Sequence, residues 1–154
     1  MKKSLLPLKL KIHQECLSLL NKRISETETN IHVIREEAQA NARSSAGDKY
    51  ETDRSMADFE IEKQQKNLDS LLQMSMILNK IDPTTLQHQT AHGTLIDTDK
   101  GYIYISVGLG RVQVDHKEVL VISMGAPIVD ILKRTGIGEK AVFNGTSYQV
   151  KGMV

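Results

Sequence analysis

The chain has 154 residues, of which 40% are hydrophobic and 25% charged, with a formal net charge of +1. This balance is typical of a soluble globular protein with one ordinary domain and an extended element. No apolar run is long enough to span a bilayer, no signal peptide is recognisable, and the single cysteine, Cys16, cannot form an internal disulfide. We therefore expect a cytoplasmic protein with no membrane partner.

Charge is distributed unevenly along the first half of the chain. Residues 1–23 carry six basic side chains against one acidic side chain, Glu15. Residues 44–62 carry six acidic side chains against two basic ones, Lys49 and Arg54. Most runs of like charge are solvated faces, so neither run identifies a partner by itself. The acidic run is the more informative of the two because it lies between two long helical patterns.

The first pattern predicts a long helix over residues 8–45. Pro7 is tolerated in a first helical turn and places the start of the helix there. One stripe of the helix is apolar at heptad spacing, although His13 and Thr27 interrupt it: Leu10, Leu17, Leu20, Ile24, Ile31, Ile34 and Ala38. A helix of this length extends for roughly 57 Å, which is longer than a small domain is wide. It must therefore protrude or pair with another element.

A second helix with a matching stripe follows at once and ends at Ile81-Asp82-Pro83. Its stripe repeats at alternating spacings of four and three: Ala57, Ile61, Gln64, Leu68, Leu71, Ser75 and Leu78. Residues 1–82 are therefore predicted to form an antiparallel coiled-coil hairpin with an acidic tip near residues 44–51. Small and polar residues crowd the stripe toward this tip, which predicts a thin tip and firm packing nearer the base.

Residues 83–91 are predicted to be a linker, and from His92 onward the period changes. Alternating β-branched and aromatic runs predict strands at residues 93–97 and 102–107, further strand over residues 112–114 and then 118–123, and two more strands at residues 141–143 and 146–150. Turn signals lie at Asp99-Lys100-Gly101 and at Asn144-Gly145, and a short amphipathic helix is predicted over residues 127–134. Residues 92–154 should thus form a small antiparallel α+β domain with elements in the order β, β, β, α, β, β.

Other groups of reactive residues have simpler interpretations. His88 and His92 are four residues apart, but threonines surround them and a helical metal pair is not expected. Gly108-Leu109-Gly110 and Gly136-Ile137-Gly138 lack the strand and long helix that accompany phosphate-binding loops. Cys16 lies within the first helix, where a buried and inert thiol is expected.

The stretch Gly47-Asp48-Lys49-Tyr50-Glu51 resembles the Gly-Asp-x-x-Glu tip of the bacterial Gre transcript-cleavage factors. It stands where that family has it, at the turn of an N-terminal antiparallel coiled coil. The second half of the chain resembles the family's C-terminal FKBP-like domain through short motifs in the same order: Gly93-Thr94-Leu95-Ile96, Tyr104-Ile105-Ser106-Val107-Gly108, Ile122-Ser123, Pro127-Ile128, Leu132 and Gly138-Glu139. The resemblance covers nearly the whole chain and implies a coiled-coil hairpin followed by an FKBP-like domain.

The resemblance implies a transcription elongation factor that is not an enzyme by itself. In Gre factors the C-terminal domain docks at the rim of the RNA polymerase secondary channel, and the coiled coil reaches a backtracked RNA 3′ end. Asp48 and Glu51 would help to hold a second Mg²⁺ and its water at the polymerase active centre, while the polymerase hydrolyses the transcript. Two carboxylates suit this hard cation but are too few to bind it tightly, so no cofactor is expected on the isolated chain.

Charge and position select further residues that lie near enough to the tip to meet RNA phosphates: Arg35, Arg43, Lys49 and Arg54. The resemblance also implies a polymerase-docking surface: Ser123, Gly125, Ala126, Pro127 and Ile128. The family commonly has Asp-Ser before this proline, and its tip typically continues with Asn-Ala-Glu-Tyr where this chain has Thr52-Asp53-Arg54-Ser55. These departures are compatible with a different polymerase surface, weaker docking, or binding without stimulation of cleavage.

Alternatives to the Gre interpretation stay open. Asp48 at an N-cap with Glu51 three residues later is also a capping-box arrangement, and capping and metal binding are compatible. The chain could instead be a regulator that occupies the channel without stimulating cleavage. It could also be a coiled-coil scaffold or an FKBP-like prolyl isomerase with no polymerase partner. Because the predicted hairpin is intramolecular, a monomer is the simpler expectation.

Overall fold

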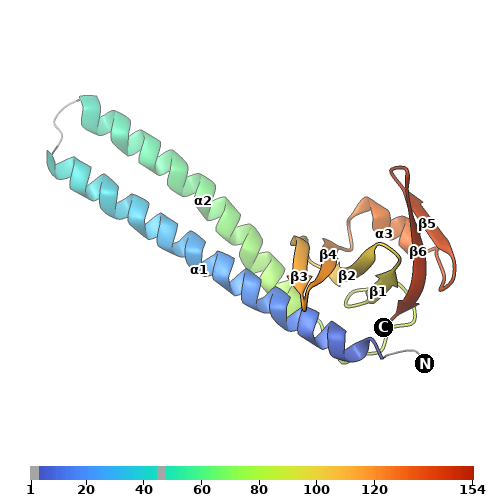
Figure 1. Ribbon diagram of the computed structural model, residues 1–154. Helices are drawn as coiled ribbons and strands as arrows, with labels where there is room; N and C mark the ends of the chain where they lie inside the picture. The colour runs from blue at the N-terminus through green and yellow to red at the C-terminus, as the bar shows by residue number, and fades with distance from the viewer. Residues whose placement is uncertain (1–3, 45–47) are drawn as a thin grey trace. The chain divides into compact units, whose positions relative to one another are not determined.

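The computed structural model describes residues 4–44 and 48–154, with side chains described for residues 4–41 and 51–154 (Figure 1). Two long helices come first, α1 (Leu6–Ser44) and α2 (Asp48–Lys80). Six strands and one short helix follow: β1 (Leu95–Thr98), β2 (Gly101–Ser106), β3 (Gly110–Val114), β4 (Lys117–Ser123), α3 (Pro127–Leu132), β5 (Lys140–Phe143) and β6 (Thr146–Met153). The predicted α+β class is confirmed, and both long helices end within two residues of the predicted limits.

The chain divides into two compact units. One consists of Leu19–Ser75, which is most of the two long helices. The other joins the chain up to Ser18 with Met76–Val154, so the first turns of α1 belong to the same unit as the sheet. The change from helical to strand periodicity does not indicate this division, because α1 continues through it without a break.

Along α2, burial follows the predicted stripe. Each of the seven stripe positions predicted for α2 is buried or half-buried, with Leu68 and Leu71 among the buried ones. Thr27, which interrupts the apolar stripe of α1, is buried as well. Its hydroxyl donates a 2.8 Å hydrogen bond to the carbonyl of Arg23, which offsets the cost of removing this polar group from water. Among the described side chains of residues 32–41 and 51–67, none is buried. Packing therefore loosens toward the junction between the helices, as the small residues predicted.

The six strands form one mixed sheet in the order β3-β4-β2-β1-β6-β5. All neighbouring strands are antiparallel except β2 and β4, which are parallel. The prediction of a purely antiparallel sheet, and of three strands before the short helix, was therefore wrong. β3 and β4 form a hairpin in which β3 takes the outer edge, so β4 lies beside β2 and runs in its direction. Alternation in the sequence shows which residues are strand, but not which strands become neighbours.

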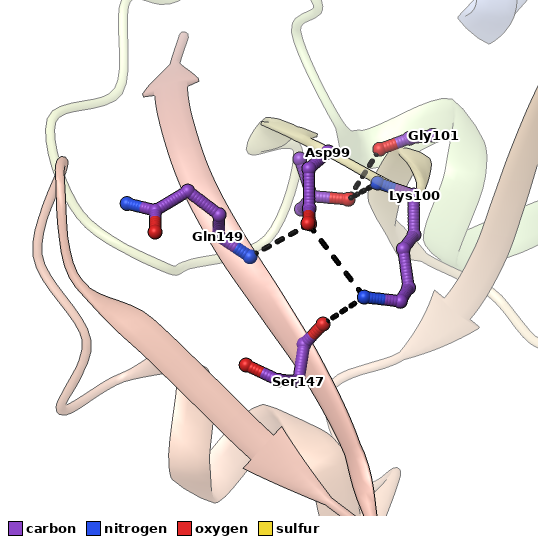
Figure 2. A network of polar contacts seen from close by, with 6 residues as sticks. Asp99, Lys100, Gly101, Ser147 and Gln149 are labelled. Atoms are coloured by element: carbon purple, nitrogen blue, oxygen red, sulfur yellow. Dashed lines mark hydrogen bonds and ion pairs between the residues drawn. The ribbon is translucent and has the colours of Figure 1, made fainter.

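The two predicted hairpin turns are confirmed. Asn144 and Gly145 have φ angles of 50° and 75°, as a type I′ turn requires. The turn between β1 and β2 is tied to β6 by the polar network in Figure 2. There the carboxylate of Asp99 accepts a 2.8 Å hydrogen bond from the backbone N–H of Gln149, and the ammonium of Lys100 donates to the carbonyl of Ser147.

The short helix α3 covers one face of the sheet. Its apolar side chains join those of four strands in a buried core: Ile96, Ile103, Ile105, Ile128, Val129, Leu132, Ala141 and Val150. The helix ends at Leu132, two residues before the predicted limit, and Lys133 and Arg134 continue it only as a turn. Because side chains alternate along a strand, Leu95, Asp97, Tyr102 and Tyr104 lie on the opposite face.

Candidate functional site

The predicted tip carboxylates lie in the first turn of α2. Asp48 is the first residue of this 33-residue helix, and Glu51, which is exposed, follows one turn later. Only three residues, 45–47, separate α2 from α1, and they lie outside the described residues together with the side chains of Asp48 and Lys49. The first turn of a helix has free backbone N–H groups and the positive end of the helix dipole, so carboxylates are stabilised there. Carboxylates are therefore stabilised here whether or not they bind a metal, so the placement by itself does not distinguish capping from metal binding.

The predicted RNA-contacting residues are only partly brought together. Arg54 is exposed and lies three residues after Glu51, so the two side chains share one side of α2. Arg35 is also exposed, but it lies nine residues before the end of α1, which is about 14 Å along the helix axis. The side chains of Arg43 and Lys49 lie outside the described residues. Among the residues placed with their side chains, Arg54 is therefore the cation nearest in sequence to the carboxylates.

The predicted docking residues extend from the last residue of β4, through the loop that follows it, into the first turn of α3. Ser123, Gly125 and Pro127 are exposed, and Ala126 is half-buried at the N-cap of α3, where it offers no side-chain hydrogen bond. Ile128 is only 6% exposed and packs in the core beneath α3. A partner at this surface would therefore meet the loop backbone and the Pro127 ring rather than the side chain of Ile128.

Sequence reasoning missed an acidic residue beside this loop. Asp130 is exposed in the first turn of α3, four residues after Ala126. The Gre family commonly has an Asp just before the proline that corresponds to Pro127. Asp130 is the carboxylate nearest in sequence to that position. The sequence could have indicated Asp130, because residues four apart lie on the same face of a helix and Asp130 follows Ala126 by four residues.

A second polar cluster, also missed, lies where the first turns of α1 pack on the sheet. Nδ1 of His13 and the hydroxyl of Tyr104 are 2.7 Å apart, both side chains are buried, and their rings meet edge to face. Lys9, which is also buried, donates a 2.8 Å hydrogen bond from Nζ to the carbonyl of Thr85. These contacts fasten the start of α1 to β2 and to the segment after α2.

Burial determines the acid–base properties of this cluster. Desolvation lowers the pKa of His13, and the nearby charge of Lys9 lowers it further, whereas Asp82 raises it. Desolvation also lowers the pKa of Lys9, although the charge of Asp82 opposes this shift. The Cys16 thiol is completely buried, and burial raises its pKa to about 12. The predicted burial of the thiol is therefore confirmed, its raised pKa disfavours the reactive thiolate, and the cluster has the properties of structural packing.

Within the described part of the chain, no group of three or more His, Cys, Asp or Glu side chains is arranged to hold a metal ion. His88 and His92 are both exposed. Over residues 4–44 and 48–154, no helix combines the length and the hydropathy that crossing a membrane requires.

Comparison with models of protein families, with curated proteins and with solved structures found no match for this chain. The likeness to Gre factors consequently rests on the short motifs quoted above and on their order along the sequence.

Proposed function

We propose that this chain is a Gre-like transcription elongation factor that binds RNA polymerase and stimulates cleavage of backtracked RNA. One observation carries the proposal. Two helices of 39 and 33 residues are separated by three residues, and the second begins with Asp48 and the exposed Glu51. This arrangement presents two carboxylates at the end of a long helical element.

In this proposal α1 and α2 form an antiparallel coiled coil. Helices joined by two to five residues are antiparallel neighbours, and the junction here has three. The buried residues on both helices recur at spacings typical of a helical interface, with Leu20 and Ile31 on α1 and Leu68 and Leu71 on α2. The 33 residues of α2 extend for about 50 Å. A rod of this length is what a factor needs to act within a deep channel.

The carboxylates would act as ligands to a shared magnesium ion. Mg²⁺ prefers six oxygen ligands and keeps several waters, so Asp48 and Glu51 would leave most positions to the polymerase, the RNA and water. Such an ion would orient the attacking water of a two-metal phosphodiester cleavage and lower the pKa of that water. The catalytic centre then belongs to the polymerase, and this chain contributes one part of it.

The unit that contains the sheet would be an FKBP-like docking module. The loop between β4 and α3 supports this, because Ser123, Gly125 and Pro127 are exposed together at one end of the helix. We infer that Asp130 supplies the acidic contact for which the family uses an Asp before the proline. Replacing Asp130 by Asn should then weaken polymerase binding, whereas Lys140→Gln, at the exposed first residue of β5, serves as a control.

A second candidate function is occupation of the channel without stimulation of cleavage. The observation that favours it is the N-cap of α3, where Ala126 provides no side-chain hydrogen bond. A docking loop without that polar contact could hold the factor in a different orientation.

Two assays separate the candidates. Immobilised protein is first used to capture RNA polymerase of the source organism, and cleavage is then followed on defined backtracked complexes with Mg²⁺. Capture with accelerated cleavage supports the Gre-like proposal. Capture with unchanged or slower cleavage supports the second candidate. Failure to capture polymerase contradicts both and favours a scaffold or an isomerase.

A further inference from the structure

An open pocket of about 410 Å³ lies on the face of the sheet opposite α3. Its floor is a row of register partners across three strands, Tyr102 on β2, Asp97 on β1 and Gly152 on β6. Ile96, which precedes Asp97, points into the core beneath α3, so Asp97 points away from that core. The pocket therefore has a polar floor built on strands, and such positions are held rigidly.

A β-bulge brings a lysine to this floor. Asp97 pairs with Gly152 and Thr98 pairs with Val150, so Lys151 between them has no partner on β1. Bulges redirect the side chain of the extra residue and often accompany functional sites. A Cβ atom at Gly152 would lie 3.5 Å from Cδ1 of Leu5, so the Leu5 side chain borders the floor at this point. Lys151 consequently lines the same pocket as Asp97.

The opposite charges of Asp97 and Lys151 are not joined. Among the described residues, no hydrogen bond and no ion pair within 4.0 Å ends on the carboxylate of Asp97. Burial raises the pKa of this carboxyl group, and the charge of Lys151 opposes the shift without cancelling it. Burial and the neighbouring Asp97 also raise the pKa of the Tyr102 phenol. A partly desolvated charge without a partner is unfavourable, so a ligand with the complementary charge would be stabilised here.

The arrangement of charges restricts the class of ligand. A metal ion needs more oxygen ligands than one carboxylate provides, and a phosphate would meet the negative charge of Asp97. A simple cation would be repelled by Lys151. A molecule with both charges satisfies both side chains, and the apolar side chains that line the pocket favour an apolar body: Leu5 and Ile137. A volume of a few hundred cubic ångströms is typical of sites for small molecules.

We propose that this pocket binds a small zwitterion, a free amino acid with an apolar side chain, with its ammonium group at Asp97 and its carboxylate at Lys151. The site is independent of the proposed role in transcription, because it uses neither the first turn of α2 nor the loop before α3. Its wall includes Ser4 and Leu5, so the ligand would also contact the two residues that precede α1.

The test is a titration of the full-length protein followed through its backbone amide resonances by NMR. The probes are leucine, leucine methyl ester, which lacks the carboxylate, and N-acetylleucine, which lacks the ammonium group. Leucine should shift the resonances of Asp97, Tyr102 and Gly152 saturably, with a dissociation constant between about 10 μM and 10 mM for two charge-assisted hydrogen bonds. Each analogue should bind at least about tenfold more weakly.

Variants assign the site. Asp97→Asn and Lys151→Gln keep the shapes of the side chains and should each weaken leucine binding by about tenfold or more. Asp58→Asn and Lys140→Gln alter exposed charges elsewhere and should bind leucine as the wild type does. The amide spectrum of each variant shows directly whether it is folded. The proposal is overturned if leucine, isoleucine, valine and methionine all give no saturable shift, if the analogues bind as well as leucine, or if folded Asp97→Asn binds normally.

Discussion

Gly93, two residues before β1, has a backbone conformation and a local environment that leave little room for a side chain. Its φ angle is +87°, and a Cβ atom built there would lie 2.8 Å from Cγ2 of Ile81. Its N–H donates a 2.7 Å hydrogen bond to the carbonyl of Ile105, so the backbone has little freedom to move away. Both the backbone conformation and the space therefore require glycine.

Gly93→Ala should lower the free energy of unfolding by roughly 2 kcal/mol, the sum of backbone strain and steric overlap. Gly108→Ala is the matched control, because nothing lies within 4 Å of a Cβ at that position. It should change stability by no more than about 0.5 kcal/mol. Urea denaturation of both variants measures the difference, and equal stability of the two would contradict the steric argument.

His13 makes the stability of the protein depend on pH. Its pKa in the folded protein lies below the ordinary value of 6.5, mainly because of desolvation and then because of the charge of Lys9. Below 6.5 the unfolded chain therefore binds more protons than the folded chain does. The contribution of His13 is fully present above this value and is lost as pH falls from 6.5 through the folded pKa. Asp82 opposes the shift, and the Tyr104 hydroxyl is the group in contact with Nδ1.

We expect the wild type to lose more stability than His13→Gln between pH of about 7.5 and about 5.5. The comparison uses urea denaturation at both pH values, and the difference between the two slopes isolates His13 from the other titrating groups. Lys9→Met tests the cause, because removing this cation should reduce the pH dependence. Equal slopes for wild type and His13→Gln would show that His13 titrates normally in the folded protein.

Some contacts and roles of single residues could be predicted from the sequence, and others could not. His13 is recognisable as a polar interruption of an apolar stripe, but its partner Tyr104 is 91 residues away. Contacts over such a distance depend on the tertiary fold, and no local pattern predicts them. Asp48 and Glu51 are recognisable because their spacing and their place between two helical patterns are both local properties.

Among the elements, the β3–β4 hairpin adopts a turn without glycine. Asp115 and His116 have φ angles of 49° and 62°, the conformation that Asn144 and Gly145 adopt in the β5–β6 turn. The second turn could be predicted because Asn-Gly prefers positive φ angles, whereas Asp-His does not. A left-handed conformation is strained for a residue with a side chain, so the β3–β4 turn carries a local cost.

His116→Gly should therefore stabilise the protein by about 0.5 kcal/mol, since relief of the strain exceeds the added entropy of the unfolded chain. His92→Gly, at another exposed histidine without a positive φ angle, provides the control and should not stabilise. Thermal unfolding of both variants measures the effect. A lower midpoint for His116→Gly than for the wild type would contradict this account of the turn.

Long helices and strand faces could be predicted, but strand neighbours could not. The stripe on α2 repeats over seven positions, so a polar residue at one of them does not change the prediction of a helix. The parallel pairing of β4 with β2 depends instead on which edge β3 occupies. Strand composition is similar for either edge, so the sequence contains no local signal for it.

For the whole molecule, the two compact units correspond to the two roles in the proposed function. The unit Leu19–Ser75 includes the ends of α1 and α2 next to the predicted tip, and the other unit includes the docking loop before Pro127. The net charge of +1 conceals an acidic segment at residues 44–62. The proposed function rests on the order of motifs along the chain, because composition and net charge alone fit many functions.

The central claim is that the carboxylates at the start of α2 act as metal ligands in the polymerase. Asp48→Asn tests it most directly, because Asn caps a helix about as well as Asp does but is a poorer ligand for Mg²⁺. Asp58→Asn, at an exposed carboxylate further along the same helix, is the matched control.

The measurement is the rate of RNA cleavage in defined backtracked complexes, with polymerase binding and thermal unfolding followed in parallel. We predict that Asp48→Asn keeps wild-type stability and polymerase binding. Its stimulation of the cleavage rate should fall by about 10-fold to 100-fold, whereas Asp58→Asn should stimulate cleavage as the wild type does. Full stimulation by a folded, polymerase-bound Asp48→Asn variant would contradict the claim and leave Asp48 as a helix cap.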